Sequence, residues 1–156
     1  MQPYAGFWLR FVASIIDSIL MQIVGGVLGA ILGMGAGFAA GDDTNVLTGV
    51  QFGSMGLSLV VQWLYFALME SSAWQATLGK KALGLVVTDE HGERIGFGRA
   101  TGRFFGKILS SITLMIGYMM AGWTERKQAL HDMMASTLVY KASSPELVRS
   151  SASVFE

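Results

Sequence analysis

Two long stretches of this chain carry almost no charge, and they constrain its fold more than any other feature. Residues 50–69 hold no charged side chain, and residues 11–40 hold only Asp17. About 20 apolar residues in a helix are enough to cross the hydrocarbon core of a bilayer. Only 14% of the residues are charged, whereas soluble domains carry about 25%. The sequence therefore predicts an all-α integral membrane protein.

A third apolar run, residues 108–123, is short for a complete span. We therefore expect three membrane-associated helical segments, of which the third either crosses the bilayer or lies along its interface. Residues 83–97 pair apolar, β-branched positions with a polar turn, which predicts a small cytoplasmic β-hairpin. These elements form one membrane domain over residues 1–141. The Ser-rich residues 142–156 are expected to be disordered.

The distribution of basic residues predicts the orientation in the membrane. The connection 41–49 holds two aspartates and no lysine or arginine, whereas the segment 71–107 is rich in both. Cytoplasmic loops carry the excess of basic residues, so the N-terminus and the segment 71–107 should both be cytoplasmic. Within that segment, Lys80 and Lys81 are expected to contact lipid headgroups. A complete third crossing would place the basic residues after 123 outside, against this rule.

The first apolar stretch contains a series of glycines at four-residue spacing, which places them on one face of a helix. Glycine allows another helix to approach closely, and close packing drives helix association in lipid. The series predicts a helix-contact stripe, within one protomer or between protomers, and the alternative is a flexible segment without a defined partner. The stripe consists of Gly25, Gly29, Gly33, Gly37 and Gly41.

Asp17 is a candidate functional residue because a charge inside a membrane segment is costly, by roughly 2.5–3.5 kcal/mol on insertion scales. Arg10 lies on the same helix face, too far along the axis for a direct ion pair. One interpretation is a polar face that lines a water-accessible path, with Asp17 exchanging a proton. The other is a structural clamp, in which Asp17 is bonded to a neighbouring helix.

His131 and Asp132 are adjacent, but they do not make a metal site. A hydrolytic metal centre needs several more ligands, His91 is the only other histidine, and cysteine is absent. We expect Asp132 to cap a helix or to pair with Arg10. His131 is expected either to be a surface residue or to titrate near neutral pH as a member of the polar network of Arg10, Asp17 and Asp132. No nucleophile motif and no phosphate-binding loop is recognisable, so we expect neither an enzyme nor a cofactor. The formal net charge is zero, which argues against nucleic-acid binding.

Three blocks of the chain, in this order, resemble the RDD family of bacterial membrane proteins, named for one arginine and two aspartates. Arg10 and Asp17 match the first block, and Asp132 matches the second aspartate in the closing block. The stretch 76–87 is similar to the family's middle block. The resemblance implies a multi-pass protein of the bacterial inner membrane, in a family for which transport of unidentified ligands has been suggested.

Two functional hypotheses follow. In the first, the protein is a transporter of an ion or small ligand, with Asp17 as the membrane-embedded site, Arg10 as its gate or partner and Asp132 as the carboxylate on the cytoplasmic side. Three short segments cannot easily enclose a path, so this hypothesis requires a homo-oligomer. In the second, the protein is a non-transporting scaffold or accessory subunit that binds another membrane protein, and the same residues form a structural network.

Overall fold

The computed structural model describes residues 4–41, 43–112 and 119–152. The chain forms two compact units. The first is the continuous segment Ser18–Leu64, and the second combines Met1–Asp17 with Tyr65–Glu156.

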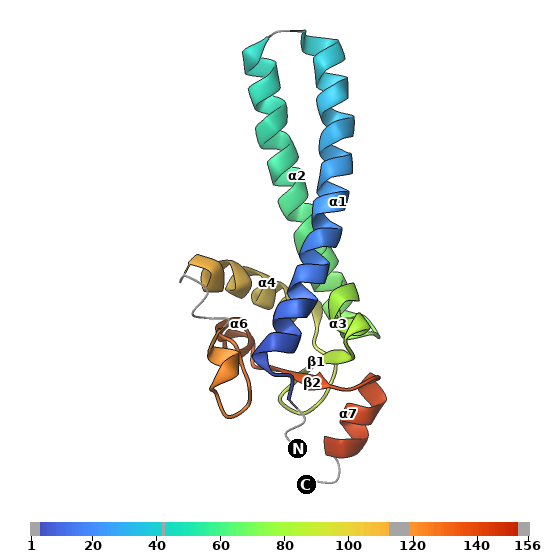
Figure 1. The fold of residues 1–156 in the computed structure, drawn as a ribbon, viewed down its shortest axis with the longest axis vertical. Coiled ribbons are helices and arrows are strands. Elements are labelled where there is room, and N and C mark those ends of the chain that lie inside the picture. Colours follow the sequence, from blue (N-terminus) through green and yellow to red (C-terminus); the bar gives the residue numbers. More distant parts are fainter. Residues whose placement is uncertain (1–3, 42, 113–118, 153–156) are drawn as a thin grey trace. The chain divides into compact units, whose positions relative to one another are not determined.

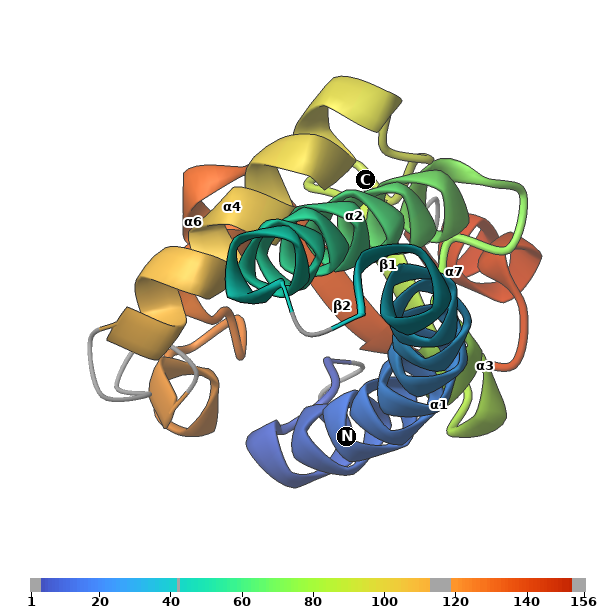
Figure 2. The ribbon, with the colours of Figure 1, turned by 90° about the horizontal axis from the view of Figure 1, so that it is seen from above.

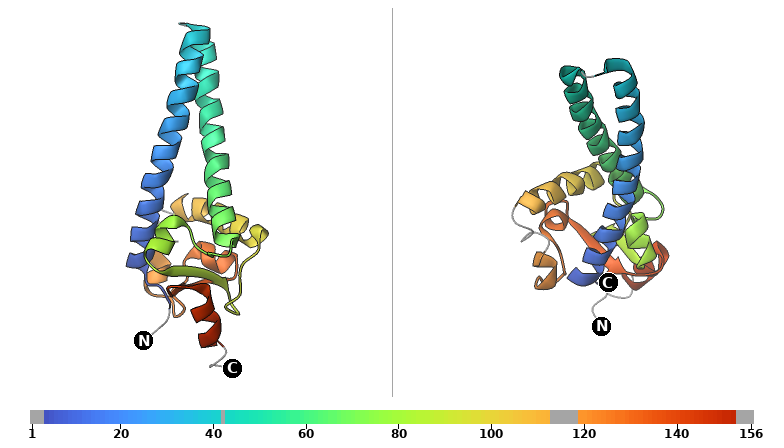
Figure 3. Two further views of the ribbon diagram at one scale, coloured as in Figure 1. Left: turned by 90° about the vertical axis from the view of Figure 1, so that its right-hand side faces the viewer. Right: turned by 45° about the horizontal axis from the view of Figure 1, so that its top comes forward.

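The first unit consists of two antiparallel helices, the greater parts of α1 (Phe7–Ala40) and α2 (Thr44–Ser71) (Figures 1 and 3). Both helices are long and apolar enough to cross a membrane, and only 6% of either span is buried inside the protein. Large aliphatic side chains point outward along both of them, as expected for a lipid-facing surface. Two of the three expected membrane segments are therefore present as candidate spans.

The glycine stripe does not bring α1 and α2 into close contact, so the structure gives no support to tight packing within one protomer, and packing between protomers stays a prediction. A side-chain carbon built at Gly25 would lie 4.0 Å from the Ser58 hydroxyl, and none of the other four stripe glycines has a neighbour within 4 Å. The two helices instead border a groove of about 660 Å³. Its lining on α2 includes the polar residues Gln51, Ser54, Ser58 and Gln62.

The second unit is built around a two-stranded antiparallel sheet of β1 (Leu85–Asp89) and β2 (Thr137–Lys141). Val87 is paired with Val139 at the centre of the ladder. The predicted local hairpin over residues 83–97 is therefore wrong, because β1 finds its partner far along the sequence. The Asp89 carboxylate accepts the backbone N–H of Glu93, which closes a turn and leads the chain into a helix rather than a returning strand.

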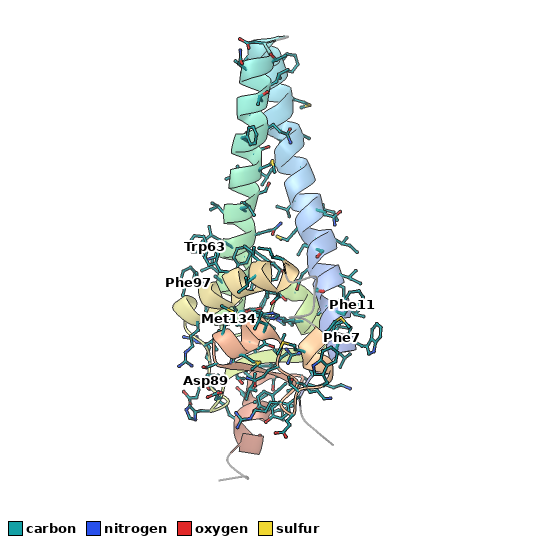
Figure 4. All side chains as sticks on the ribbon, turned by 90° about the vertical axis from the view of Figure 1, so that its left-hand side faces the viewer. Phe7, Phe11, Trp63, Asp89, Phe97 and Met134 are labelled. Atoms are coloured by element: carbon teal, nitrogen blue, oxygen red, sulfur yellow. The ribbon has the colours of Figure 1, made fainter. Side chains whose placement is uncertain are left out.

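Short helices surround this sheet: α3 (Leu78–Ala82), α4 (Phe97–Ile112), α6 (Leu130–Met134) and α7 (Pro145–Ala152). Helix α4 packs on α6 (Figures 1 and 2). The N-terminal segment runs beside β2, where the Ala5 N–H donates to the Val139 carbonyl at 2.8 Å. Figure 4 shows Phe7 and Phe11 on the first turns of α1, where their rings stack at 5.8 Å.

Two further expectations differ from the structure. In the tail expected to be disordered, Pro145–Ala152 form α7, where Val148 is only 2% exposed, and residues 153–156 lie outside the described residues. The third expected span, 108–123, is divided: its first part belongs to α4, residues 113–118 lie outside the described residues, and Met120–Gly122 form a 3-10 helix. Within the described residues, only α1 and α2 qualify as candidate spans.

Candidate functional site

Asp17 lies in a polar pocket of the second unit, and only 1% of its surface is exposed. The Thr77 hydroxyl donates to one carboxylate oxygen at 2.5 Å. The Tyr65 hydroxyl and the Gly79 N–H both donate to the other oxygen at 2.9 Å. Three hydrogen bonds from protein groups compensate much of the cost of burying the carboxylate.

The carboxylate of Asp17 serves as a cap for α3 from another part of the chain. The first backbone N–H groups of a helix have no partner within the helix. Thr77, which precedes α3, is extended and makes no cap with its own side chain. Asp17 accepts the Gly79 N–H and so acts as the N-terminal cap of α3. The geometry corresponds to the structural clamp, one of the two interpretations of Asp17 from the sequence.

Replacing Gly79 by alanine is expected to destabilise the second unit by about 1–3 kcal/mol, the usual cost of overpacking a dense site. A Cβ there would collide with the Ala13 carbonyl oxygen and lie 2.9 Å from the Asp17 carboxylate carbon. The measurement is the melting temperature in detergent micelles. Gly102→Ala in α4 is the matched control, since a Cβ at Gly102 meets nothing within 4 Å. Equal melting temperatures for the two variants would contradict the close approach at Gly79.

A second cluster surrounds Asp132, which is fully buried. Its carboxylate forms an ion pair with Arg10, and its other oxygen lies 2.7 Å from Nη2 of Arg103. The oxygen that pairs with Arg10 also accepts the Ala129 N–H at 3.1 Å, and this hydrogen bond closes the first turn of α6. Burial alone would raise the pKa of the Asp132 carboxyl, but the two guanidinium groups outweigh it and hold that pKa well below its usual range. The expected pair of Arg10 with Asp132 is therefore present.

Glu70, at the end of α2, holds a third cluster that the sequence analysis did not identify. Its carboxylate, 0% exposed, lies 2.5 Å from Lys80 Nζ, 3.2 Å from Lys107 Nζ and 3.3 Å from Arg103 Nε. Arg103 therefore joins Glu70 to Asp132, and its Nη1 also donates to the Thr137 hydroxyl at 3.2 Å. The available signal was the spacing of Arg103 and Lys107, which puts both cations on one face of α4.

Lys80 does not face lipid headgroups as expected. It is only 8% exposed, because Glu70 draws its ammonium group into the unit. Burial lowers the pKa of Lys80 below its usual value, and the attraction of Glu70 opposes this shift. Lys81 does reach the surface, where its ammonium lies 3.2 Å above the Trp74 ring. The headgroup contact of Lys81 stays a prediction.

His131 lies beside the Asp132 cluster and is 5% exposed. Its Nδ1 is 3.5 Å from the Ser110 hydroxyl, and its Nε2 is 3.5 Å from the Asp132 carboxylate. Burial lowers the pKa of His131 to about 3, despite the attraction of Asp132. The imidazole of His131 is therefore neutral at physiological pH. Separately, the described residues contain no group of three or more His, Cys, Asp or Glu side chains that could hold a metal ion.

The lowered pKa of His131 predicts a loss of stability in mild acid. Between the unfolded pKa of about 6.5 and the folded pKa of about 3, the unfolded state binds more protons, so stability falls as the pH falls. Acidification from pH 7 to pH 5 should cost about 2 kcal/mol through this residue. The charged groups that face it are Asp132, Arg103, Lys107 and Lys80.

The test of this prediction compares the wild-type protein with His131→Gln at pH 7 and pH 5, by hydrogen exchange of the strand amides in nanodiscs. The variant retains the carboxylates and cations of the network, so these contribute in both proteins. We expect a smaller loss of protection in the variant on acidification. An identical loss in the two proteins would show that His131 does not resist protonation in the fold.

The three family-like residues fall into two of these clusters. Arg10 and Asp132 are brought together, whereas Asp17 is held by Tyr65, Thr77 and the start of α3. The cluster of Glu70 connects to that of Asp132 through Arg103. Each of these three buried carboxylates therefore has at least one oxygen that accepts hydrogen bonds from its own protein chain.

Comparisons with known proteins agree with the resemblance seen in the sequence. A family model described as the RDD family matches residues 4–136. A Bacillus subtilis (strain 168) protein named "Uncharacterized protein YxaI" is 37% identical over 152 residues, which cover 90% of this chain and all of that relative. No solved structure matches. The matched range includes Arg10, Asp17 and Asp132.

Proposed function

Because the chain belongs to the RDD family, we propose that it is a membrane-anchored accessory subunit, a non-transporting scaffold that binds another membrane protein. In this proposal Arg10, Asp17 and Asp132 are structural residues that hold the second unit together. The observation that carries it is the complete engagement of Asp17 by Thr77 and its neighbours. A carboxylate that relays protons or ions needs access to water or to the transported ion.

The proposal includes two crossings of the bilayer, with the second unit in the cytoplasm of a bacterium. Strands β1 and β2 pair directly, and the N-terminal segment hydrogen-bonds β2 through Ala5. Paired strands lie on one side of a membrane, so the chain between them returns to the side from which it starts. This geometry favours a third apolar segment that does not cross. The basic residues of the segment 71–107 favour the cytoplasmic side.

The experiment measures ion and proton flux in proteoliposomes that contain the wild-type protein or Asp17→Asn, together with native mass spectrometry of gently solubilised membranes. The accessory role predicts no flux above protein-free vesicles and a hetero-complex of fixed stoichiometry. Wild-type flux that Asp17→Asn abolishes, with the melting temperature unchanged, would overturn it. Glu93→Gln, at an exposed turn position, serves as the matched carboxylate control.

Transport by a homo-oligomer is the second candidate, and the groove of the first unit favours it. Gln51, Ser54, Ser58 and Gln62 present polar groups to this groove from a helix otherwise suited to lipid. Polar side chains inside a span commonly mark a substrate or ion path. The first measurement is the particle mass in nanodiscs, which gives the number of subunits. A closed oligomer whose flux is reduced by Gln62→Leu would support transport. A monomer would exclude a transport path formed between subunits.

A further inference from the structure

One face of α4 is apolar and largely exposed. Phe105 is 57% exposed and Ile112 is 72% exposed, with Ile108 and Leu109 at 42% between them. Their spacing follows the helical repeat, so they form one stripe. We call these four residues the outer face of α4. Such a contiguous apolar surface marks an interaction site rather than an ordinary surface.

The opposite face of α4 is fixed in the interior of the second unit. Arg103 is 1% exposed within its ion pairs, and Ser110 is 0% exposed. A Cβ at Gly106 would lie 2.9 Å from the Cβ of His131, so α4 approaches α6 closely there. The helix cannot rotate to bury its outer face without breaking these contacts.

Side chains of α4 also contact the end of α2. The ring of Phe104 lies 6.1 Å from that of Phe66. Lys107 places its ammonium 4.0 Å from the Phe66 ring and 3.2 Å from Glu70. The sequence of α2 changes from apolar to charged at Glu70. In the two-crossing topology proposed above, this residue marks the end of the part of α2 that lies in the hydrocarbon region. The middle of α4, at Phe104 and Lys107, therefore lies beside the end of this candidate span.

We propose that the outer face of α4 lies in the cytoplasmic interface of the bilayer, with the helix parallel to the membrane and in contact with acyl chains. The end of α2 contacts α4 directly through the rings of Phe66 and Phe104, and this adjacency to a candidate span favours lipid as the occupant. An amphipathic helix at this level buries its apolar face about 5–10 Å into the interface. Lys107 lies at the border, where its stem contacts apolar groups and its ammonium stays with charged ones. The inference rests on the two crossings proposed above.

The test uses the absence of cysteine from the chain, which makes every introduced cysteine a unique labelling site. Spin labels are placed by Phe105→Cys, Ile108→Cys and Ile112→Cys in the full-length protein, reconstituted in phosphatidylglycerol–phosphatidylethanolamine vesicles. Collisions with oxygen report lipid exposure, and collisions with a water-soluble nickel chelate report water exposure. We expect all three labels to favour oxygen and to lie at one shallow depth. The control is Arg99→Cys, on the first turn of α4, whose side chain is 53% exposed and should favour the nickel chelate.

The alternative outcomes separate this inference from the proposed function. Labels that become steadily deeper from 105 to 112 would indicate a crossing helix, and would overturn both the inference and the two-crossing topology. Labels that favour the nickel chelate would overturn the inference alone and leave the face to another protein. Dipolar broadening between labels on different molecules would assign the face to a second copy of the chain and would also overturn it.

Discussion

Replacing Asp132 by asparagine is expected to destabilise the folded protein by about 3–5 kcal/mol, the usual cost of leaving buried charges without their counter-ion. The substitution preserves the shape of the side chain but removes the charge shared by Arg10 and Arg103. Arg10 then loses its counter-ion, and Arg103 keeps only Glu70 to compensate its desolvation. The measurement is hydrogen exchange of the strand amides in nanodiscs, which reports the free energy of opening the unit.

Glu90→Gln supplies the matched control for Asp132→Asn. Glu90 also forms an ion pair, with Arg126 at 3.7 Å, but about half of its side chain is exposed. Exposed pairs contribute little, because water solvates both partners when they separate. We expect no measurable change in exchange for Glu90→Gln. If Asp132→Asn also left hydrogen exchange unchanged, the buried ion pair of Arg10 and Asp132 would not hold the N-terminal segment to α6.

The candidate spans were predictable from the sequence because their signal is local. The absence of charge from residues 50–69 and the single carboxylate in residues 11–40 define two apolar helices without reference to the rest of the fold. The structure lengthens both, to Phe7–Ala40 and Thr44–Ser71. Helix ends depend on local competition between water and backbone partners, and a hydropathy pattern does not specify that competition.

The strand pairing could not be predicted in the same way. The stretch before Asp89 has the composition of a strand, but composition does not specify a partner. A turn at Asp89 favours a local hairpin, and the sequence analysis assumed one. In the structure, the pairing of Val87 with Val139 joins segments far apart in the chain. The apolar side chains of β2 are available for this pairing because α6 ends at Met134 and leaves Leu138 and Val139 to the core.

The candidate site was predicted only in part, because some of its residues are recognisable only from contacts between distant segments of the chain. Asp17 attracts attention because a charge within an apolar segment is costly, and Arg10 because it shares the helix face of Asp17. Asp132 was selected by its neighbour His131 and by the resemblance to a family. Arg103 looks like an ordinary member of a basic helix, and only the fold shows that it bridges two buried carboxylates. Glu70 looks like the polar end of a span. Their function within the network depends on tertiary contacts, which spacing along one helix cannot supply.

Replacing Glu70 by glutamine is expected to destabilise the protein by about 3–5 kcal/mol as well. Glu70 is the common counter-ion of Lys80, Arg103 and Lys107, and the neutral amide leaves their charges uncompensated. The loss should appear as weaker protection of the strand amides and a lower melting temperature in micelles. Unlike Asp132→Asn, it should also loosen the contact between the end of α2 and α4.

A double variant shows whether the loss comes from unpaired charge. Adding Lys80→Met to Glu70→Gln removes one buried cation, and we expect part of the stability to return. Lys80→Met alone should be destabilising, since it deprives Glu70 of its partner at 2.5 Å. A double variant that is less stable than either single variant would contradict this account and would assign the effect of Glu70 to packing. Recovery would show that charge balance at the membrane boundary, rather than the Glu70 side chain itself, holds the second unit together.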